Sequence, residues 1–302
     1  MNPRERGFLL LSSHLGDPSR PVLTTAQLRT LALRVQSAPW PEWEDRQLRE
    51  EDLLALGYGR DMAQRITGLL EDEKQLDRYL RLGKNQGCIP VTRVSEDYPA
   101  LLRQRLGLDA PGCLWAKGDL SLLHTPAVSL VGSRDLRQEN GRFAERVGYE
   151  AAMQGLTLVS GNARGADRTA QNACLMAGGR VISIVADELA RHNPLRNQLL
   201  LSEEDYLAPF SAQRALSRNR CIHALGWMVM VAQARPYRGG TWDGTVKNLR
   251  HGWSPVACFR DGSESARLLS QMGAYLIDPD DLGNLDDLTK ARETLNKSSA
   301  AE

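Results

Sequence analysis

The sequence has no apolar run of about 18 residues or more, so it contains no segment that is expected to span a membrane. An apolar stretch near its start, residues 8–11, is shorter than the roughly 7 to 15 residues of a signal-peptide core. With 42% hydrophobic and 25% charged residues, the composition is typical of a globular protein. These features predict a protein that stays in the cytoplasm and does not engage a membrane.

Cysteine and histidine are scarce and scattered. The five cysteines are odd in number and far apart, which fits neither a metal site nor a secreted disulfide framework. The histidines show no spacing typical of a metal site, and no Ser-His-Asp arrangement can be recognised. The sequence therefore predicts a protein that is not an enzyme and that holds no metal or cofactor. The residues concerned are Cys88, Cys113, Cys174, Cys221 and Cys258, with His14, His124, His192, His223 and His251.

The formal net charge is only +1, which argues against a protein that coats nucleic acid along its whole surface. The charge is nevertheless uneven along the chain. Between Pro126 and Arg250 there are 16 Lys and Arg residues against 11 Asp and Glu residues, and arginine dominates. Arginine suits bidentate phosphate recognition. An ordinary solvated surface explains the same excess equally well.

A chain of 302 residues is long enough for two domains. Residues 1–85 have leucine at helical spacing, and Gly57 and Gly59 interrupt a long helical segment. This pattern predicts a helical domain of the SAM or helix-hairpin-helix type. Such a unit could grip a nucleic-acid backbone through amides at a helix N-terminus, although a small helical interaction domain is the favoured interpretation. Residues 289–302 are polar and are predicted to form a frayed tail.

Residues 86–288 are predicted to form the second domain, which begins with a connector marked by turn signals at Tyr98-Pro99 and Pro111-Gly112. Beyond it, short apolar segments alternate with helical ones. This alternation predicts an α/β fold, an extended Rossmann-like parallel sheet with helices on both faces, preceded by the small helical domain. The segments expected to form strands lie within residues 127–131, 156–161, 180–186, 227–234, 254–259 and 274–282.

Two glycine- and arginine-containing loops follow the first two of these strands. In such a sheet the ligand lies beyond the carboxyl ends of the strands, where loops lead into helices. Glycine lets a backbone approach a ligand closely, and amides of the loop together with an arginine can surround an anion. A well-made turn from strand to helix is the alternative for either loop alone. The residues predicted to bind phosphate here are Gly132, Ser133 and Arg134, with Ser160, Gly161, Arg164 and Gly165.

Two further segments are expected near the same edge. Arg218 and Arg220 flank Asn219 at the start of a helix, so one arginine can face the ligand while the other pairs within the protein. A purely structural pairing of arginine with aspartate, for instance with Asp167, is the alternative. Gly240 and Thr241 belong to another glycine-rich loop and are also predicted to bind phosphate. Trp242, next in the chain, either stacks on a base or packs over its own loop.

Five motifs in order along the chain resemble the DNA-processing protein A family, DprA or Smf. They are Tyr98-Pro99, residues 111–118, Val131 to Arg134, Ser160 to Asp167, and Arg218 to Arg220. The resemblance covers roughly residues 50–280. It implies a Rossmann domain behind a helical domain, binding of single-stranded DNA, and handover to the RecA recombinase during DNA uptake and transformation, usually as a dimer.

Carried over by position, the resemblance makes Asp167 and Asn219 structural supports. It assigns contacts with the DNA backbone to Gly132, Ser133, Arg134, Ser160, Gly161, Arg164, Gly165, Arg218 and Arg220. The chain departs from the family at Gln171, where histidine is frequent, at residues 192–194, and at residues 239–242. No C-terminal winged helix is expected after the Rossmann domain. A divergent member that acts in defence or genome maintenance is therefore an alternative.

The rival class is a sensor or hydrolase of small nucleotides, for example in phage defence. Related Rossmann families hydrolyse glycosidic bonds with a P-G-G-x-G-T-x-x-E loop. Here the nearest stretch is GGTWDGTVKN, in which Asn248 stands in place of the glutamate. Without that carboxylate the sequence disfavours hydrolysis but still allows a sensor. NAD is not expected, because no G-x-G-x-x-G follows the first strand.

Overall fold

The described part of the first 85 residues is helical. A computed structural model describes residues 1–38 and 47–285, and the predicted tail at 289–302 lies outside them. Gly57 takes a left-handed φ of +81° in the turn after the third helix, a conformation that glycine adopts without strain. The chain turns again at Asp72, a break that the glycine pattern did not indicate. The helices are α1 (Pro3–Ser12), α2 (Thr25–Gln36), α3 (Glu50–Ala55), α4 (Arg60–Leu70) and α5 (Glu73–Asn85).

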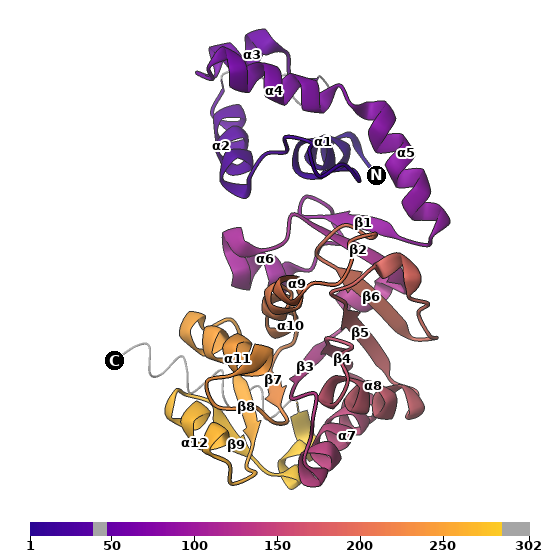
Figure 1. Cartoon of the computed structure of the whole chain (residues 1–302), viewed down its shortest axis with the longest axis vertical. Coiled ribbons are helices and arrows are strands. Elements are labelled where there is room, and N and C mark those ends of the chain that lie inside the picture. The colour runs from indigo at the N-terminus through magenta and orange to yellow at the C-terminus, as the bar shows by residue number, and fades with distance from the viewer. Residues whose placement is uncertain (39–46, 286–302) are drawn as a thin grey trace.

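A nine-stranded sheet follows, in the order β1-β2-β6-β5-β4-β3-β7-β8-β9 (Figure 1). The strands from β6 to β9 in this order pair in parallel, as expected for a Rossmann-like α/β fold. The fold class predicted from the sequence is therefore confirmed. The strands are β1 (Ile89–Thr92), β2 (Cys113–Gly118), β3 (Ala127–Val131), β4 (Thr157–Ser160), β5 (Arg180–Ile184), β6 (Gln198–Ser202), β7 (Val229–Val231), β8 (Val256–Phe259) and β9 (Tyr275–Ile277).

Three of these strands were not expected in the sheet: β6 was not predicted at all, and the extended pieces of the connector were expected only to pack onto this domain. The expected connector supplies β1 and β2, and β2 pairs antiparallel with both β1 and β6, so the sheet is mixed at this edge. Strand β6 contains only three consecutive leucines between polar residues, which is too short a signal to separate a strand from a loop. The sheet is consequently wider than the sequence pattern indicated.

Helices cover both faces of the sheet because the strand side chains alternate. Val128 and Leu130 of β3 face a core formed with α7 (Gln138–Met153) and α8 (Ala166–Met176). Val131, which points the other way, belongs to the opposite core. That second core is covered by α6 (Ala100–Leu106), α10 (Asn219–Leu225), α11 (Gly239–His251) and α12 (Glu264–Gln271), while the short helix α9 (Ala212–Ser217) precedes α10.

The helical part and the sheet share one apolar core. Tyr79 of α5, Trp115 of β2 and Tyr206 pack against one another, with ring centroids 4.7 to 5.4 Å apart. The Tyr206 hydroxyl donates a hydrogen bond of 3.0 Å to the backbone oxygen of Tyr79. Leu200 of β6 belongs to the same cluster, so the helices rest directly on the antiparallel edge of the sheet.

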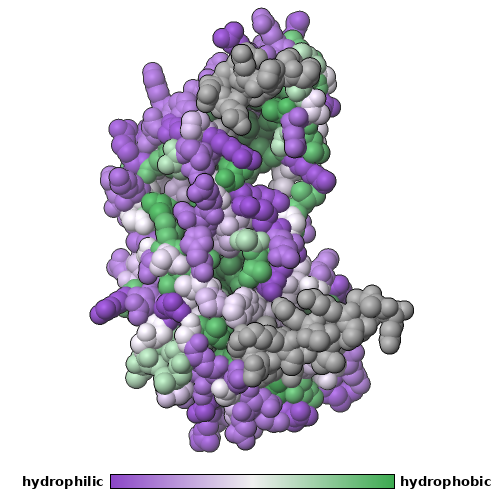
Figure 2. Space-filling view, turned by 180° about the vertical axis from the view of Figure 1, so that it is seen from behind, coloured by the Kyte–Doolittle hydropathy of each residue, from purple (hydrophilic) through white to green (hydrophobic). Residues whose placement is uncertain are grey.

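Hydrophilic residues predominate on the face shown in Figure 2, and apolar residues gather there only in small, separate areas. Within residues 1–38 and 47–285, no helix combines the length and apolar character needed to cross a membrane.

Candidate phosphate-binding site

The chain reverses its direction of progress across the sheet at β3. From β3 it continues through β4, β5 and β6 on one side, and then returns to β7 on the other side. Ligands of such sheets bind beyond the carboxyl ends of the strands at this switch point. The loops that follow β3, β4 and β7 meet here.

The two loops predicted from their glycines lie directly against each other. A Cβ on Gly132 would stand 2.4 Å from the Cβ of Ala166, and one on Gly165 would stand 2.4 Å from the backbone oxygen of Arg134. Gly165 also has a left-handed φ of +86°. The Ala166 amide donates a hydrogen bond of 3.2 Å to the Ser133 oxygen. Glycine at both positions is thus required for the close approach of the two loops.

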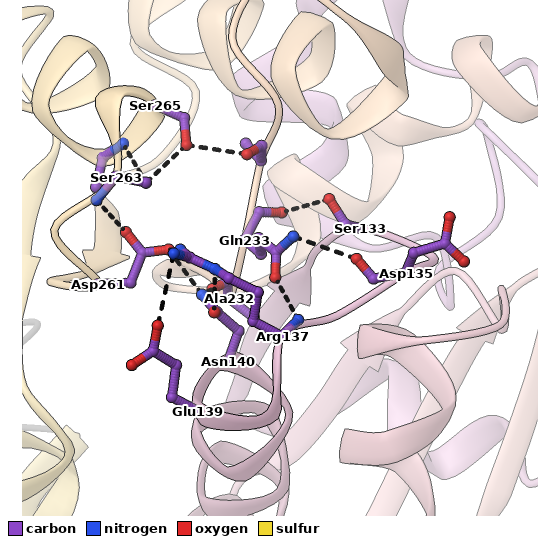
Figure 3. A network of polar contacts seen from close by, with 12 residues as sticks. Ser133, Asp135, Arg137, Glu139, Asn140, Ala232, Gln233, Asp261, Ser263 and Ser265 are labelled. Carbon is purple, nitrogen blue, oxygen red and sulfur yellow. Dashed lines mark hydrogen bonds and ion pairs between the residues drawn. The ribbon is translucent and has the colours of Figure 1, made fainter.

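Gln233, which follows β7, fastens the loop after β3 from the other side (Figure 3). Its backbone oxygen accepts a hydrogen bond of 2.9 Å from the Ser133 amide, and its Oε1 accepts one of 2.9 Å from the Arg137 amide. Its side-chain amide donates to the backbone oxygen of Asp135 at 3.2 Å. Gln233 therefore joins the loop after β7 to the loop after β3 across the switch point.

A buried carboxylate extends this network to the loop after β8 (Figure 3). Asp261 has a side chain 2% exposed, pairs with Arg137, and accepts hydrogen bonds of 2.8 Å from Asn140 and 2.9 Å from the Ser263 amide. Burial alone would raise the pKa of Asp261, but the hydrogen bonds from Ser263 and Asn140, together with Arg137, hold it below its usual value. Asn140 also donates to the Ala232 oxygen at 2.7 Å. These contacts give the exposed parts of the loops a rigid support.

On the exposed side of the same loops two arginines pair with one acid, and a third arginine precedes that acid in the chain. Asp135 accepts from Arg164 at 2.7 Å and from Arg235 at 3.4 Å. The side chains of Asp135, Arg164 and Arg235 are all more than 60% exposed. Arg134, which precedes Asp135 in the chain, is also exposed. Among the described residues, the exposed Arg134 side chain has no hydrogen-bond or ion-pair partner. We call Arg134, Arg164 and Arg235 the arginine cluster; they come from the loops after β3, β4 and β7.

Asp135 and Arg235 were not among the residues predicted from the sequence. They are 100 positions apart, and only the pairing of β3 with β7 brings them together. The excess of arginine in this half of the chain was a signal for such a site, but it gave no position.

Two residues predicted to touch phosphate have buried side chains instead. Ser160 is fully buried, and its hydroxyl accepts a hydrogen bond of 3.1 Å from Gln171. Arg218 is 7% exposed and donates to the backbone oxygens of Gly161 and Ile184, at the ends of β4 and β5. Neither side chain can reach a ligand on the surface without a rearrangement. In this structure both side chains make contacts inside the protein, and Arg218 holds the ends of β4 and β5 together beneath the loops.

Asp167 and Asn219 hold the loops through hydrogen bonds. The Asp167 Oδ2 accepts from the amides of Gly161 and Ala163 at 3.1 and 3.2 Å. Burial raises the pKa of Asp167 to about 6, and the neighbouring Arg218 opposes that rise. The Asn219 side chain donates to the Gly240 oxygen at 3.0 Å. Both residues therefore contact backbone, in keeping with a supporting place.

The remaining predicted residues lie at a different place. Arg220 pairs with the buried carboxylate of Glu203 at 2.6 Å and donates to the backbone oxygen of Asp109 at 2.9 Å. Arg220 and Gly240 line a cavity of about 850 Å³ that none of the arginine cluster lines. Thr241 is half-buried beside Gly240 at the start of α11. The structure thus divides the predicted set between two places.

Asn248, which stands where a hydrolase would have glutamate, is fully buried in α11. Its side-chain amide donates to His223 Nδ1 at 3.2 Å and to the Ser254 hydroxyl at 3.1 Å, and its oxygen accepts from the Ser254 amide at 2.9 Å. All these contacts are internal. Burial lowers the pKa of His223 to about 3.

The depressed pKa of His223 predicts acid sensitivity. The folded protein holds this histidine neutral, so its contribution is complete above the unfolded pKa of about 6.5 and is lost as the pH falls below it. We expect His223 to reduce the free energy of unfolding by about 2 to 3 kcal/mol between about pH 7 and pH 4.5. Urea unfolding at several pH values, compared with His223→Leu, measures this. An equal decline in both proteins would contradict the assignment.

Comparison with known proteins places this Rossmann-like chain in a family of DNA recombination proteins. Residues 90–284 match the family model described as DNA recombination-mediator protein A. The match covers more than half of the chain, which belongs to this family. The DprA/Smf resemblance seen in the sequence is therefore confirmed.

Individual relatives agree with the family. The DNA processing protein DprA of Streptococcus pneumoniae is 28% identical over 260 residues, which cover 76% of this chain and 89% of that protein. The protein Smf of Escherichia coli is 30% identical over 208 residues, which cover 64% of this chain and 54% of that protein. The chain thus aligns with only about half of Smf.

Two solved structures are similar in fold. The crystal structure of the Streptococcus pneumoniae DprA superposes with a TM-score of 0.64 and 26% identity, covering 84% of this chain and 95% of that one. The Helicobacter pylori DNA processing protein A gives a TM-score of 0.53 and 24% identity, covering 70% and 96%. The latter structure was described for its single-stranded DNA binding mode.

Proposed function

We propose that this protein binds single-stranded DNA through phosphates seated on the arginine cluster. The observation that carries the proposal is that Arg164 and Arg235, from two different loops, meet at Asp135, which directly follows the exposed Arg134 in the chain. Gln233 and Asp261 fix the loop after β3, and Asp167 holds the loop after β4. Guanidinium groups match phosphate geometry, and a rigid support reduces the ordering cost of binding. The single-stranded DNA binding described for the Helicobacter pylori protein supports the choice of ligand.

The same geometry favours binding over chemistry and a strand over a small nucleotide. Gln233 spans the switch point, where a nucleotide would otherwise insert between the loops, so the accessible charge lies above them. The buried Asn248 replaces the carboxylate on which a related hydrolase would depend. We therefore propose a protein that holds DNA without cleaving it.

Family membership supports a wider proposal about partners and place. We propose that a homodimer of this chain acts in the cytoplasm, protects incoming or damaged single strands, and delivers them to the RecA recombinase. Co-sedimentation of RecA with the protein and DNA, compared with DNA alone, tests the delivery step.

The DNA proposal is tested by titrating labelled single-stranded oligonucleotides of about 30 nucleotides against rising salt. Each phosphate contact on a single strand contributes about −0.7 to the slope of log K against log salt. Three arginine contacts predict a slope of about −2. Absence of binding, or a slope near zero, would refute the proposal.

Asp135 is expected to oppose DNA binding, because it neutralises the two arginines that it bridges. The Asp135→Asn variant should bind single-stranded DNA about threefold to tenfold more tightly at low salt, with a steeper salt slope. Glu145→Gln, an exposed acid on α7, is the control and should leave the affinity unchanged. Weaker binding by Asp135→Asn would mean that the acid positions the arginines more than it competes with phosphate.

A further inference from the structure

A tight turn beside the arginine cluster holds an aromatic residue in an unusual conformation. The Arg238 amide donates a hydrogen bond of 3.2 Å to the Arg235 oxygen, which closes the turn over residues 235–238. Pro236 takes the second position, and Tyr237 takes the third with a φ of +60°. Positive φ at the third position is the mark of turns that ordinarily carry glycine or asparagine there. A bulky residue with such a φ is strained, and strained residues of this kind gather at functional sites.

The Tyr237 ring is exposed and has a firm backing. Its side chain is 71% exposed, whereas the neighbouring Trp242 is 6% exposed. The two ring centroids are 5.3 Å apart, with the planes inclined by 55°. An aromatic ring so exposed gains little from burial, so packing does not account for the strained conformation. The contact with the buried Trp242 fixes one side of the ring and leaves the rest open to solvent.

Positive charge lies on both sides of this ring along the chain. Arg235 belongs to the arginine cluster, and the exposed Arg238 side chain has no hydrogen-bond or ion-pair partner among the described residues. Single-strand binding sites combine cationic groups for the backbone with aromatic rings on which bases stack. The turn supplies both within four residues.

We propose that Tyr237 is a stacking platform for a nucleobase of the strand whose phosphates lie on the arginine cluster. The inference rests on the proposed function and deepens it, because it adds base contact to phosphate contact. Stacking involves the π-face that every base possesses, so the platform accepts all four bases. It also gives the site a reason to prefer unpaired strands, since bases in a duplex already stack on each other.

The test compares two ligands of equal length, an oligothymidylate of about 20 nucleotides and an abasic deoxyribose-phosphate strand. Wild-type protein, Tyr237→Ala and Tyr237→Phe are titrated with each at one salt concentration. Tyr237→Ala should bind oligothymidylate about tenfold more weakly and the abasic strand as wild type does. Tyr237→Phe, which keeps the ring, should match wild type on both. Tyr149→Ala, which removes an exposed tyrosine on α7, is the matched control.

The outcomes separate this inference from the proposed function. Unchanged binding of oligothymidylate by Tyr237→Ala, with normal wild-type affinity, overturns the stacking platform and leaves the DNA proposal intact. Equal losses on both strands also overturn it, because they show that the bases are not the contact. Failure of the wild-type protein to bind either strand overturns the proposed function and the platform with it.

Discussion

Replacing Arg218 with leucine is expected to lower the free energy of unfolding by about 2 to 5 kcal/mol. The guanidinium is buried and donates to the backbone oxygens of Gly161 and Ile184. Each buried acceptor left without a donor costs roughly 1 to 3 kcal/mol. The substitution also removes the cation that most favours the charged form of the buried Asp167. Chemical denaturation followed by circular dichroism measures the loss.

Two variants locate the cause of that loss. Arg218→Lys retains the charge but cannot reproduce the planar guanidinium, so its stability should lie between those of wild type and the leucine variant. Arg164→Leu removes an arginine that is 75% exposed, and it should cost no more than about 1 kcal/mol. Wild-type stability of Arg218→Leu combined with weakened DNA binding would instead support the direct phosphate contact that the sequence suggested.

The second large effect concerns the arginine cluster itself. The triple variant Arg134→Ala, Arg164→Ala, Arg235→Ala should bind single-stranded DNA about 100-fold more weakly at low salt, from about 1 kcal/mol for each lost contact. Its salt slope should fall toward zero, because these three groups no longer displace counterions from the phosphates. Its thermal stability should change little, because all three side chains are exposed.

A matched triple variant controls for the change in net charge. Arg29, Arg81 and Arg250 are exposed, and none has a side-chain partner among the described residues. Their replacement by alanine alters net charge equally but leaves the cluster intact. If both triple variants lose affinity to the same extent, binding follows overall charge and the site is misplaced.

The sequence predicted the fold better than it predicted the edge of the sheet. Strands β3 and β4 are apolar runs followed at once by glycine loops, and such runs are easily recognised. Strand β6 is not followed by a glycine loop, and β1 and β2 lie among turn residues. Antiparallel pairing at the edge depends on contacts between distant segments, which local periodicity does not encode.

The site shows the same division between local and long-range information. Gly132 and Gly165 were found because glycine in a loop that follows an apolar strand marks a place where the backbone approaches another segment closely. The sequence allowed one of Arg218 and Arg220 to point inward but could not say which, because a residue that precedes a helix can point either to solvent or under a neighbouring loop. Tyr237 could not be found either, because its positive φ is a property of the folded backbone, and tyrosine is not a residue that indicates such a turn position.

The shared aromatic core has a practical consequence for dissecting this protein. Tyr79 contributes to a cluster with Trp115 and Tyr206, so a truncated chain that begins at residue 86 would present both remaining rings and Leu200 to water. An apolar surface of this kind promotes self-association. A fragment that holds every residue of the arginine cluster would thus be prone to aggregate, although nothing had been cut near its binding surface. The helical part acts as a cover that keeps the sheet soluble.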